Sequence, residues 1–459
     1  MPDLPQYDDI HADRLQALND KAVADDGDYV LYWMQHGQRA EWNHALEYAV
    51  RRANALDLGV VVGFGLYDDY PDGNARHFQF MLQGLLEVKH ALSERNIKFV
   101  MRLGEPDRVA LDLAERAALV VCDRGYLRLH RRWRRRVAEA SPVRVIQVES
   151  ELVVPVEVAK DEQAYNARSL RGTLLEKYEA YLKRPVHRHV QKSSLSLTID
   201  KLDFSSVAAV MKQLSIDRSV APVAEFTGGT SAAKKRFRAF MRDHLTAYDE
   251  HRSEPHTEHV SFMGMYLHLG QISPCYLLDE ISSSHSTENK ESFIEEVLVR
   301  RELTHNFVFY NKEYDSFQCL PDWAAETLEA HKDDERPHIY TRAELERGET
   351  DDPYWNAAMR QMRERGYLHN HMRMYWGKQL LKWTNTPSYA YRTALYLNNK
   401  YFLDGRDANS FANIAWLFGL HDRAWKERDI YGKVRIMTQD GLERKTDPEK
   451  FVDKVDGGT

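Results

Sequence analysis

The chain has 459 residues, of which 43% are hydrophobic and 29% charged, so it is too apolar for a disordered protein and long enough for two or three domains. Its net charge of −7 argues against a protein that coats nucleic acid over its whole surface, although a local basic face stays open. Aromatic residues at 11% suit a cofactor or base-stacking pocket, and equally the core of a large helical enzyme.

The first half of the chain has the pattern of an α/β domain. Residues 1–27 are polar, and we expect a flexible N-terminal segment there. Apolar runs then predict strands at Tyr29–Met34, Val60–Phe64, Lys98–Arg102, Leu119–Cys122 and Arg144–Val148. Stretches of helical period between them predict helices at Trp42–Ala55, Ala75–Glu94, Arg108–Ala117 and Leu127–Ala138. This alternation predicts a Rossmann-like parallel α/β domain over residues 28–150.

The second half of the chain has a different pattern. Residues 151–225 open with the apolar Leu152–Val156, continue as a polar stretch, and are predicted to be a long interdomain linker. Helical periodicity dominates from about Ala232, and strand signals almost vanish. We therefore predict an all-helical domain over residues 226–459, so that the fold class is α/β followed by all-α.

The cysteines and the N-terminal sequence indicate in which compartment the protein is expected. Cys122, Cys275 and Cys319 show no paired spacing, so neither a disulfide framework nor a thiolate metal site is expected. The polar, acidic N-terminus is not a signal peptide, and no apolar run approaches the roughly 20 residues of a membrane helix. We expect a cytoplasmic protein without a membrane partner.

Two clusters invite a functional interpretation that their spacing does not favour. His251, His256 and His259 lie close together, but Pro255 interrupts the helix that would align them, so no metal is expected. The basic run Arg128–Arg136 is typical of a solvated helix face. A role in phosphate binding is the less favoured alternative.

A tryptophan pair in the second half is more informative. Trp376 and Trp383 are seven residues apart, so on a helix they share a face about 10 Å apart along the axis. From spacing alone, a structural core stripe is the favoured explanation. Arg373 lies one turn before Trp376, and a buried guanidinium there needs an anionic partner.

The segment Leu403–Trp416 places several short polar side chains in a glycine-containing turn before an apolar helix. Asp404, Asp407, Asn409 and Asn413 exceed what helix capping requires. The pattern is typical of a polar ligand held over the start of a helix.

Motifs from Tyr29 to Met437 together resemble the class II cyclobutane pyrimidine dimer photolyases of the photolyase/cryptochrome family. The matching motifs are Tyr32-Trp-Met-Gln35, Asp123-Arg-Gly-Tyr-Leu-Arg128, Tyr266-Leu-His268, Val299-Arg-Arg-Glu-Leu303, Met374-Tyr-Trp376, Asp404-Gly-Arg-Asp407 and His421–Arg428. The resemblance implies an N-terminal α/β domain, a long linker and a C-terminal helical domain that binds FAD, in agreement with the pattern of elements.

The resemblance also implies a cofactor site. Arg373 and Asp404 would be an ion pair beside the flavin ring, and Asn398 would lie near its N5 atom. The implied FAD contacts are Tyr248, Ser261, Gly264, Asn370, Arg373, Asp404 and Asp407. The implied electron-transfer chain consists of Trp355, Trp376 and Trp383.

For the substrate, the resemblance implies DNA that contains cyclobutane pyrimidine dimers, split in light by an electron from reduced FAD. Glu296 and Trp416 would receive a dimer flipped out of the duplex, and Arg252 would occupy the space it leaves. Glu296, Asn398 and Trp416 are thus the expected catalytic residues. We expect a monomer, and an antenna chromophore such as a deazaflavin stays open.

The chain departs from the family pattern at two places. Met263-Gly264-Met265 replaces a loop that carries a serine hydroxyl, and Ala408-Asn409-Ser410 replaces Pro-Asn-Gly. Both departures concern the affinity for FAD. Three other functions stay open: a cryptochrome-like photoreceptor on the same fold, repair of the (6-4) photoproduct, and a flavoprotein that binds DNA without repairing it.

Overall fold

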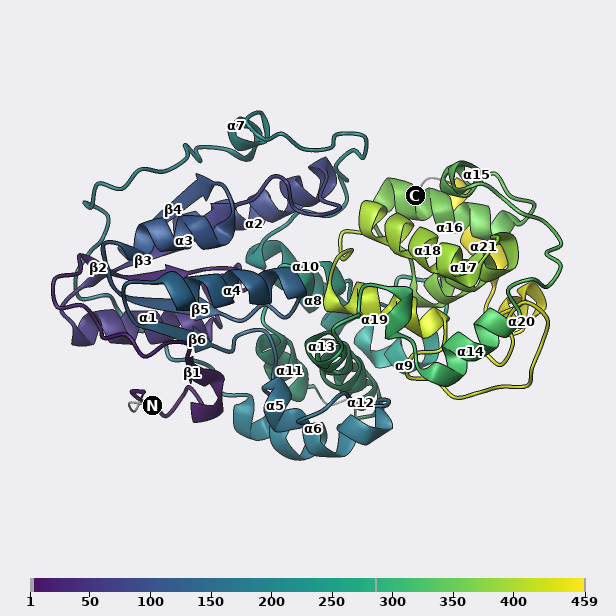
Figure 1. Ribbon diagram of the computed structural model, residues 1–459, viewed down its shortest axis with the longest axis horizontal. Coiled ribbons are helices and arrows are strands. Elements are labelled where there is room, and N and C mark those ends of the chain that lie inside the picture. Colours follow the sequence, from purple (N-terminus) through teal and green to yellow (C-terminus); the bar gives the residue numbers. More distant parts are fainter. Residues whose placement is uncertain (1–3, 285–286, 458–459) are drawn as a thin grey trace.

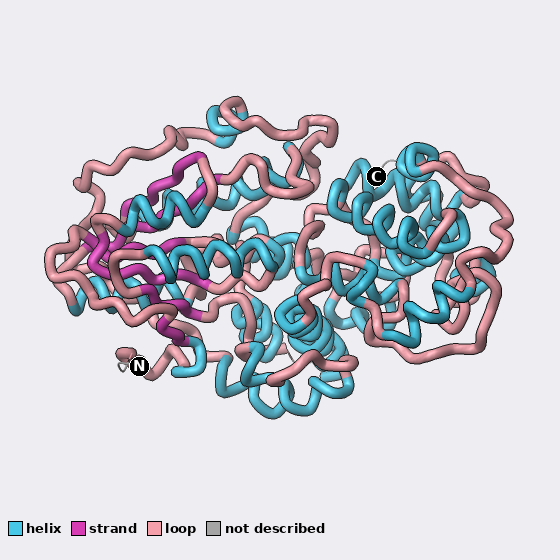
Figure 2. The backbone as a smooth tube through the Cα atoms, viewed as in Figure 1, coloured by secondary structure: helices cyan, strands magenta, loops and turns pink. Residues whose placement is uncertain are grey.

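The computed structural model describes residues 4–284 and 287–457. It has an α/β half and a helical half, which lie side by side along the longest axis (Figure 1). The strands gather in the first half, and the second half consists of helices and loops (Figure 2). None of the described helices is long and apolar enough to cross a membrane.

The α/β half is built on a six-stranded sheet in the order β1-β6-β5-β2-β3-β4. Its strands are β1 (Leu15–Ala17), β2 (Tyr29–Trp33), β3 (Gly59–Leu66), β4 (Lys98–Leu103), β5 (Ala117–Asp123) and β6 (Val145–Val148). The strands β2 to β6 run parallel, and β1 pairs antiparallel to β6. The order of the chain reverses between β2 and β5, which is the point where doubly wound sheets bind ligands beyond the carboxyl ends of their strands.

Every predicted strand and helix of this half is confirmed, with small shifts of the ends. The helices are α1 (His44–Ala55), α2 (Ala75–Glu94), α3 (Pro106–Ala114) and α4 (Arg128–Ala140). The strand β1 was missed, because three residues with little apolar pattern carry no strand signal. Part of the segment expected to be flexible is thus paired to the sheet, and Arg14 beside it is buried and donates to four backbone carbonyls.

The connector between the halves contains helices of its own, which are α5 (Val156–Ala159), α6 (Arg168–Tyr181) and α7 (Val207–Met211). It first packs α5 and α6 below the helical half and then returns along the outside of the α/β half, where it carries α7 (Figure 1).

The helical half folds around two clusters of buried apolar side chains. Its helices are α8 (Thr230–Asp243), α9 (Tyr248–His251), α10 (Gly264–His268), α11 (Pro274–Ser282), α12 (Thr287–Ile294), α13 (Arg301–Tyr310), α14 (Asp322–Ala330), α15 (Arg342–Arg347), α16 (Pro353–Arg365), α17 (Asn370–Trp383), α18 (Pro387–Tyr401), α19 (Ala408–Leu417), α20 (Gln439–Glu443) and α21 (Pro448–Asp456). A π-helical turn, η3 (Glu295–Arg300), joins α12 to α13.

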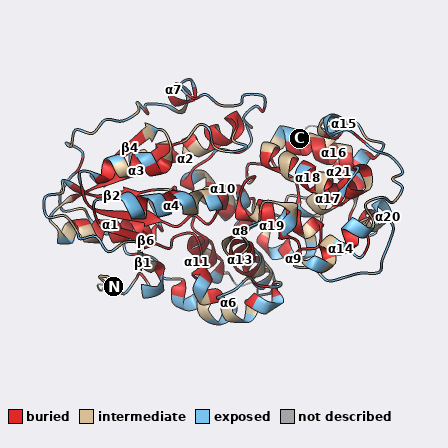
Figure 3. Ribbon diagram, in the orientation of Figure 1, coloured by how far each residue is buried: buried red, intermediate tan, exposed pale blue. Residues whose placement is uncertain are grey.

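Buried arginines fasten the two halves to each other. Arg76 of α2 donates to the carbonyls of Tyr401 and Met362, and Arg39 donates to that of Gly270. Because such charged donors are costly to leave unpaired, these contacts fix how the halves dock. Burial is continuous from the sheet into the central helices (Figure 3).

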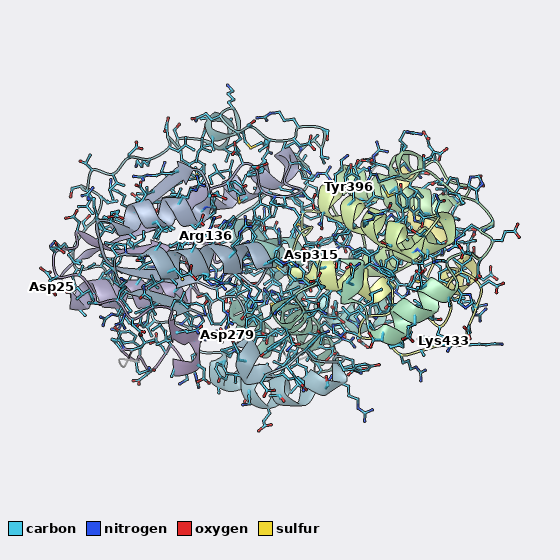
Figure 4. All side chains as sticks on the ribbon, viewed as in Figure 1. Asp25, Arg136, Asp279, Asp315, Tyr396 and Lys433 are labelled. Carbon is cyan, nitrogen blue, oxygen red and sulfur yellow. The ribbon has the colours of Figure 1, made fainter. Side chains whose placement is uncertain are left out.

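The basic run on α4 is largely engaged within the protein. Arg128 pairs with Asp315 at 2.8 Å, and Arg136 pairs with Asp107 at 2.9 Å; Figure 4 labels Arg136 and Asp315. Arg134 is buried and donates to the carbonyl of Gly125 at 2.6 Å. The run is therefore only in part a solvated face, because Arg134 is buried and two of the exposed arginines pair with acidic side chains.

Candidate functional site

The site predicted for the flavin is organised by an ion pair between α17 and the turn that follows α18. Nη2 of Arg373 lies 3.0 Å from both carboxylate oxygens of Asp404. Nε of Arg373 donates to the Leu368 carbonyl at 2.8 Å, and the guanidinium lies 3.9 Å from the ring centroid of Phe402. Both charged side chains keep about one fifth of their surface exposed, at 20% and 21%. The anionic partner that the sequence required for Arg373 is therefore Asp404.

The backbone of Gly264 comes close to this pair. A Cβ atom added at Gly264 would lie 3.1 Å from Oδ2 of Asp404, so a larger residue would crowd the carboxylate. Ser261, just before, accepts a hydrogen bond from the Met263 N–H at 3.4 Å, and Asn370 is exposed at the first residue of α17. The structure thus brings Gly264 together with the Arg373–Asp404 pair, and charged groups beside a glycine backbone fit a polar nucleotide such as FAD.

Two other predicted cofactor residues are placed differently. Asp407 caps α19 through the Ala408 N–H and is buried, with its carboxylate 3.8 Å from His268. Burial disfavours its charge, but the neighbouring His268, His305 and Arg301 outweigh this and lower the pKa of Asp407. Asp407 therefore faces a buried polar cluster toward the α/β half. Tyr248 is buried at the start of α9.

The three predicted electron-transfer tryptophans form a continuous ladder. Trp355 of α16 stacks on Trp376 with 6.4 Å between ring centroids and 13° between planes, and it meets Trp383 edge-on at 5.5 Å. Nε1 of Trp355 donates to the Trp376 carbonyl at 2.8 Å. The pair on α17 is thus bridged by a ring from a neighbouring helix. Tyr340 packs against Trp383 at 5.5 Å and extends the ladder by one ring.

Asn398 lies on α18 and is buried. Its side-chain amide donates to Oδ1 of Asn399 at 3.2 Å, and the Asn399 amide in turn donates to Asp72 of the α/β half. Asn399 also accepts from the Arg406 N–H at 3.0 Å. The asparagine pair therefore fixes the turn that carries Asp404.

Two residues predicted to face DNA are paired with each other. Nη1 of Arg252 lies 2.7 Å from Oε1 of Glu296, and both side chains are partly exposed. Glu296 stands in the π-helical turn η3, a geometry that is often found at functional sites. The Arg252 carbonyl contacts Nε2 of His369, the N-cap residue of α17, at 3.0 Å. The pair thus joins α9, η3 and the start of the helix that carries Arg373.

Trp416 lies near the end of α19 and is half-buried. The ammonium of Lys378 is 5.2 Å and the guanidinium of Arg435 is 5.7 Å from its ring centroid. Within residues 4–284 and 287–457, no hydrogen bond or ring contact joins Trp416 to Glu296 or Arg252. The three predicted substrate residues therefore form a pair and a separate indole.

A pocket opens at the carboxyl edge of the sheet, beside the point between β2 and β5 where the order of the strands reverses. Its cavity volume is about 100 Å³, and the hollow around it opens to solvent. Several buried polar atoms of its wall have no hydrogen-bond partner among the described residues: Nε2 of Gln35, Oε1 of Gln38, Nδ1 of His130, Nε1 of Trp133, both ring nitrogens of His268 and Nε of Arg406. Because buried polar groups are normally paired, these atoms are free to bond to a bound molecule or to water.

Some residues of these sites escaped sequence reasoning. Lys378 is an isolated cation in the apolar stretch from Tyr375 to Leu381, and that isolation was a usable signal. Gln35 and Gln38 directly follow the first parallel strand, which is where ligands of such sheets bind. Nothing in the sequence around Arg406 predicted that its side chain lines this pocket. Its direction depends on the left-handed backbone of the turn (φ 67°), which only the folded structure shows. The described residues contain no group of three or more His, Cys, Asp or Glu side chains that could hold a metal.

Two family models match the chain. The model described as DNA photolyase matches residues 30–185, and the model described as the FAD binding domain of DNA photolyase matches residues 293–454. A deoxyribodipyrimidine photo-lyase of Methanothermobacter thermautotrophicus is 44% identical over 98% of this chain and 99% of the relative. One of Potorous tridactylus is 35% identical over 94% of this chain and 82% of its own.

Solved structures have the same fold. A cryptochrome of Synechocystis matches with a TM-score of 0.73 at 15% identity, over 93% of this chain and 88% of its own. A class III photolyase of Agrobacterium tumefaciens matches with a TM-score of 0.66 at 18% identity, over 94% and 85%. At these identities the likeness concerns the fold alone, and it supports the prediction of an α/β half followed by a helical half.

Proposed function

Because this chain belongs to the DNA photolyase family, we propose that it repairs DNA with light and that its substrate is the cyclobutane pyrimidine dimer. The two relatives named above carry the name deoxyribodipyrimidine photo-lyase and align over nearly the whole chain, which supports the same activity here. We further propose that the chain is a class II enzyme, on the motifs that extend from Tyr29 to Met437.

FAD is the cofactor that the helical half is built to hold. When bound in its reduced form, FAD supplies the light-excited electron donor. We assign Arg373, Asp404 and the backbone of Gly264 to binding it, together with Ser261 and Asn370. The pair Asn398–Asn399 holds the turn of Asp404 in place. Asp407 acts through that turn, because its own carboxylate faces His268.

The observation that carries the proposal is the tryptophan ladder. Trp376 lies one helical turn after Arg373, and its ring leads through Trp355 to Trp383. Stacked and edge-on indoles in contact form a path for electrons between the cofactor region and the periphery of α17. We assign this path to the reduction of the flavin.

For the substrate, we assign Glu296 and Arg252 to the damaged site and Trp416 to stacking against its bases. A segment with an excess of basic residues follows Trp416 along the chain, where Arg423, Lys426, Arg428 and Lys433 are exposed around the exposed Trp425, together with the acidic Glu427 and Asp429; Figure 4 labels Lys433. Cations beside an exposed indole suit a phosphate backbone with an unstacked base. We propose that this face binds DNA although the chain as a whole is acidic.

The pocket at the carboxyl edge of the sheet is the candidate site for an antenna chromophore. Its wall combines the aromatic rings of Tyr70 and Trp133 with unpaired donors and acceptors. We assign it to a flat chromophore rich in heteroatoms, of which a deazaflavin is one example.

The remaining assignments are proposals of the same kind. We divide the chain into a segment 1–27, an α/β domain 28–150, a connector 151–225 and a helical domain 226–459. We propose a monomer in the cytoplasm, a reducing compartment that suits three buried free cysteines. The alternatives are a cryptochrome-like photoreceptor or repair of another lesion. A blue-light assay on dimer-containing oligonucleotides, with the flavin reduced, separates repair from signalling.

A further inference from the structure

Lys378 is a fully buried lysine beneath the indole proposed to receive the damaged bases. It is 1% exposed, and its ammonium donates to the carbonyl of Leu417, the residue after Trp416. The same ammonium lies 5.2 Å from the ring centroid of Trp416. A buried ammonium is costly unless its contacts compensate, so its placement here calls for a reason.

The fold delivers this side chain by a close approach of two helices. A Cβ atom at Gly377 would lie 2.1 Å from Cδ1 of Leu417, so a larger residue would have to displace the Leu417 side chain from between α17 and α19. Leu417 is the last residue of α19, where carbonyls lack helical partners and the helix dipole favours a cation. Lys378 thus caps the helix that carries Trp416 and also lies over its ring.

Few charges surround the ammonium. Asp422 and Arg435, from the segment after α19, act on it with opposite signs, and the Tyr431 hydroxyl donates to the Lys378 carbonyl at 3.1 Å. Burial lowers the pKa of Lys378 to about 7, with Asp422 opposing and Arg435 adding to the shift. Arg435 is itself held by Asp422 at 2.9 Å and lies 4.4 Å from the ring centroid of Trp425. Trp416 is therefore the inner ring of a cation–aromatic stack that leads to the exposed Trp425.

We propose that Lys378 is a positioning residue that fixes the indole of Trp416 for stacking on the bases of a DNA lesion. This rests on the proposed role of Trp416. The ammonium acts twice on adjacent residues, through the Leu417 carbonyl and through the electrostatic attraction of a cation to an aromatic face. When either contact is lost, the Trp416 ring is free to rotate. Fixing the ring when the lesion binds then costs conformational entropy and weakens binding.

The test is binding in the dark of a dimer-containing duplex and of the same intact duplex. Lys378→Met keeps the length of the side chain and removes the charge, so it should reduce the preference for the dimer on the order of tenfold. Lys378→Arg keeps the charge and should retain most of the preference. Lys382→Met, one turn further along α17, is the matched control and should leave it unchanged.

A pH series on the wild type gives a readout that needs no variant of Lys378. The neutral amine still donates to Leu417, so only the charge over the ring is lost as the pH rises. The preference for the dimer should fall between about pH 7 and 9, and it should stay flat in Lys378→Arg and in Trp416→Ala.

The outcomes separate this inference from the proposed function. If Trp416→Ala weakens dimer binding, whereas Lys378→Met and the pH series change nothing, Lys378 is only a helix cap and the inference is overturned. If Trp416→Ala has no effect either, the assignment of Trp416 fails first. In the double variant, Lys378→Met should add little to Trp416→Ala, because both changes remove the same stacking contact.

Discussion

Arg252 and Glu296 share an ion pair, with 2.7 Å between Nη1 and Oε1, although they come from different elements, the end of α9 and the π-helical turn η3. A carboxylate placed against a pyrimidine would repel negative charge on it. The guanidinium changes this, because it neutralises the carboxylate and offers donors of its own. The pair therefore acts as one unit toward a lesion.

The first prediction concerns Glu296. Glu296→Ala should lower dimer splitting per absorbed photon several-fold when binding is saturated, because the lesion loses the side chain that we assign to hydrogen bonding with it. Glu296→Gln keeps an acceptor for Arg252 and should retain part of the yield. Glu295→Gln is the control, because Glu295 pairs with Arg171 and Arg300. An equal loss of splitting yield in Glu296→Ala and in Glu295→Gln would mean that both changes merely perturb η3.

The second prediction concerns the ladder. Trp355→Phe, Trp376→Phe and Trp383→Phe should each suppress the photoreduction of oxidised flavin and spare repair after chemical reduction. The middle ring contacts both others, so its loss interrupts the path as fully as the loss of an end. Bleaching of the flavin absorption under blue light is the measurement, with the buried Trp33→Phe as control. Parallel loss of both activities would make these rings structural core.

The third prediction concerns the cofactor. Asp404→Ala leaves the Arg373 guanidinium without its carboxylate, and FAD affinity should fall about 10- to 100-fold, from a charged hydrogen bond of about 1.5–3 kcal/mol. Gly264→Ala should weaken binding less, by crowding Asp404. Flavin retained per chain after gel filtration is the readout. Unchanged retention in Asp404→Ala would remove this pair from the site.

The fourth prediction concerns stability. The pKa of Lys378 is about 7 in the fold and near 10.5 when exposed, so between these values the unfolded chain binds more protons. Its contribution therefore makes stability rise with pH across this window, by at most about 1.4 kcal/mol per unit. Denaturant unfolding from pH 7 to 9 should show a flatter slope in Lys378→Met than in Lys382→Met. Equal slopes would contradict a buried, titrating lysine.

Most of the fold could be predicted from the sequence, but only part of the candidate site. Strands such as Val60–Phe64 are buried on both faces, so their continuous apolar runs allowed them to be predicted from the sequence. The strand β1 was not, because pairing with β6 depends on a partner more than 100 residues away. Arg373 needed an acidic partner, and the fold supplies Asp404, 31 residues further along.

Other parts of the site depend on packing between helices. The spacing of Trp376 and Trp383 suggested a shared face, but only the position of α16 inserts Trp355 between them. Asp407 lies three residues after Asp404, yet the turn aims it toward His268. Lys378 reaches Trp416 because α17 and α19 pack closely at Gly377, a relation that neither local sequence contains.

The central claim is tested most directly by the thymines restored per absorbed blue photon in a dimer-containing oligonucleotide, with FAD fully reduced and binding saturated. We predict light-dependent restoration that is absent in the dark. In Trp416→Ala, the affinity for the dimer, measured separately, should fall by one to two orders of magnitude for about 1–3 kcal/mol of stacking. If the protein binds the dimer and holds reduced FAD but restores no thymine under light, it is not a photolyase in activity, and the photoreceptor alternative takes its place.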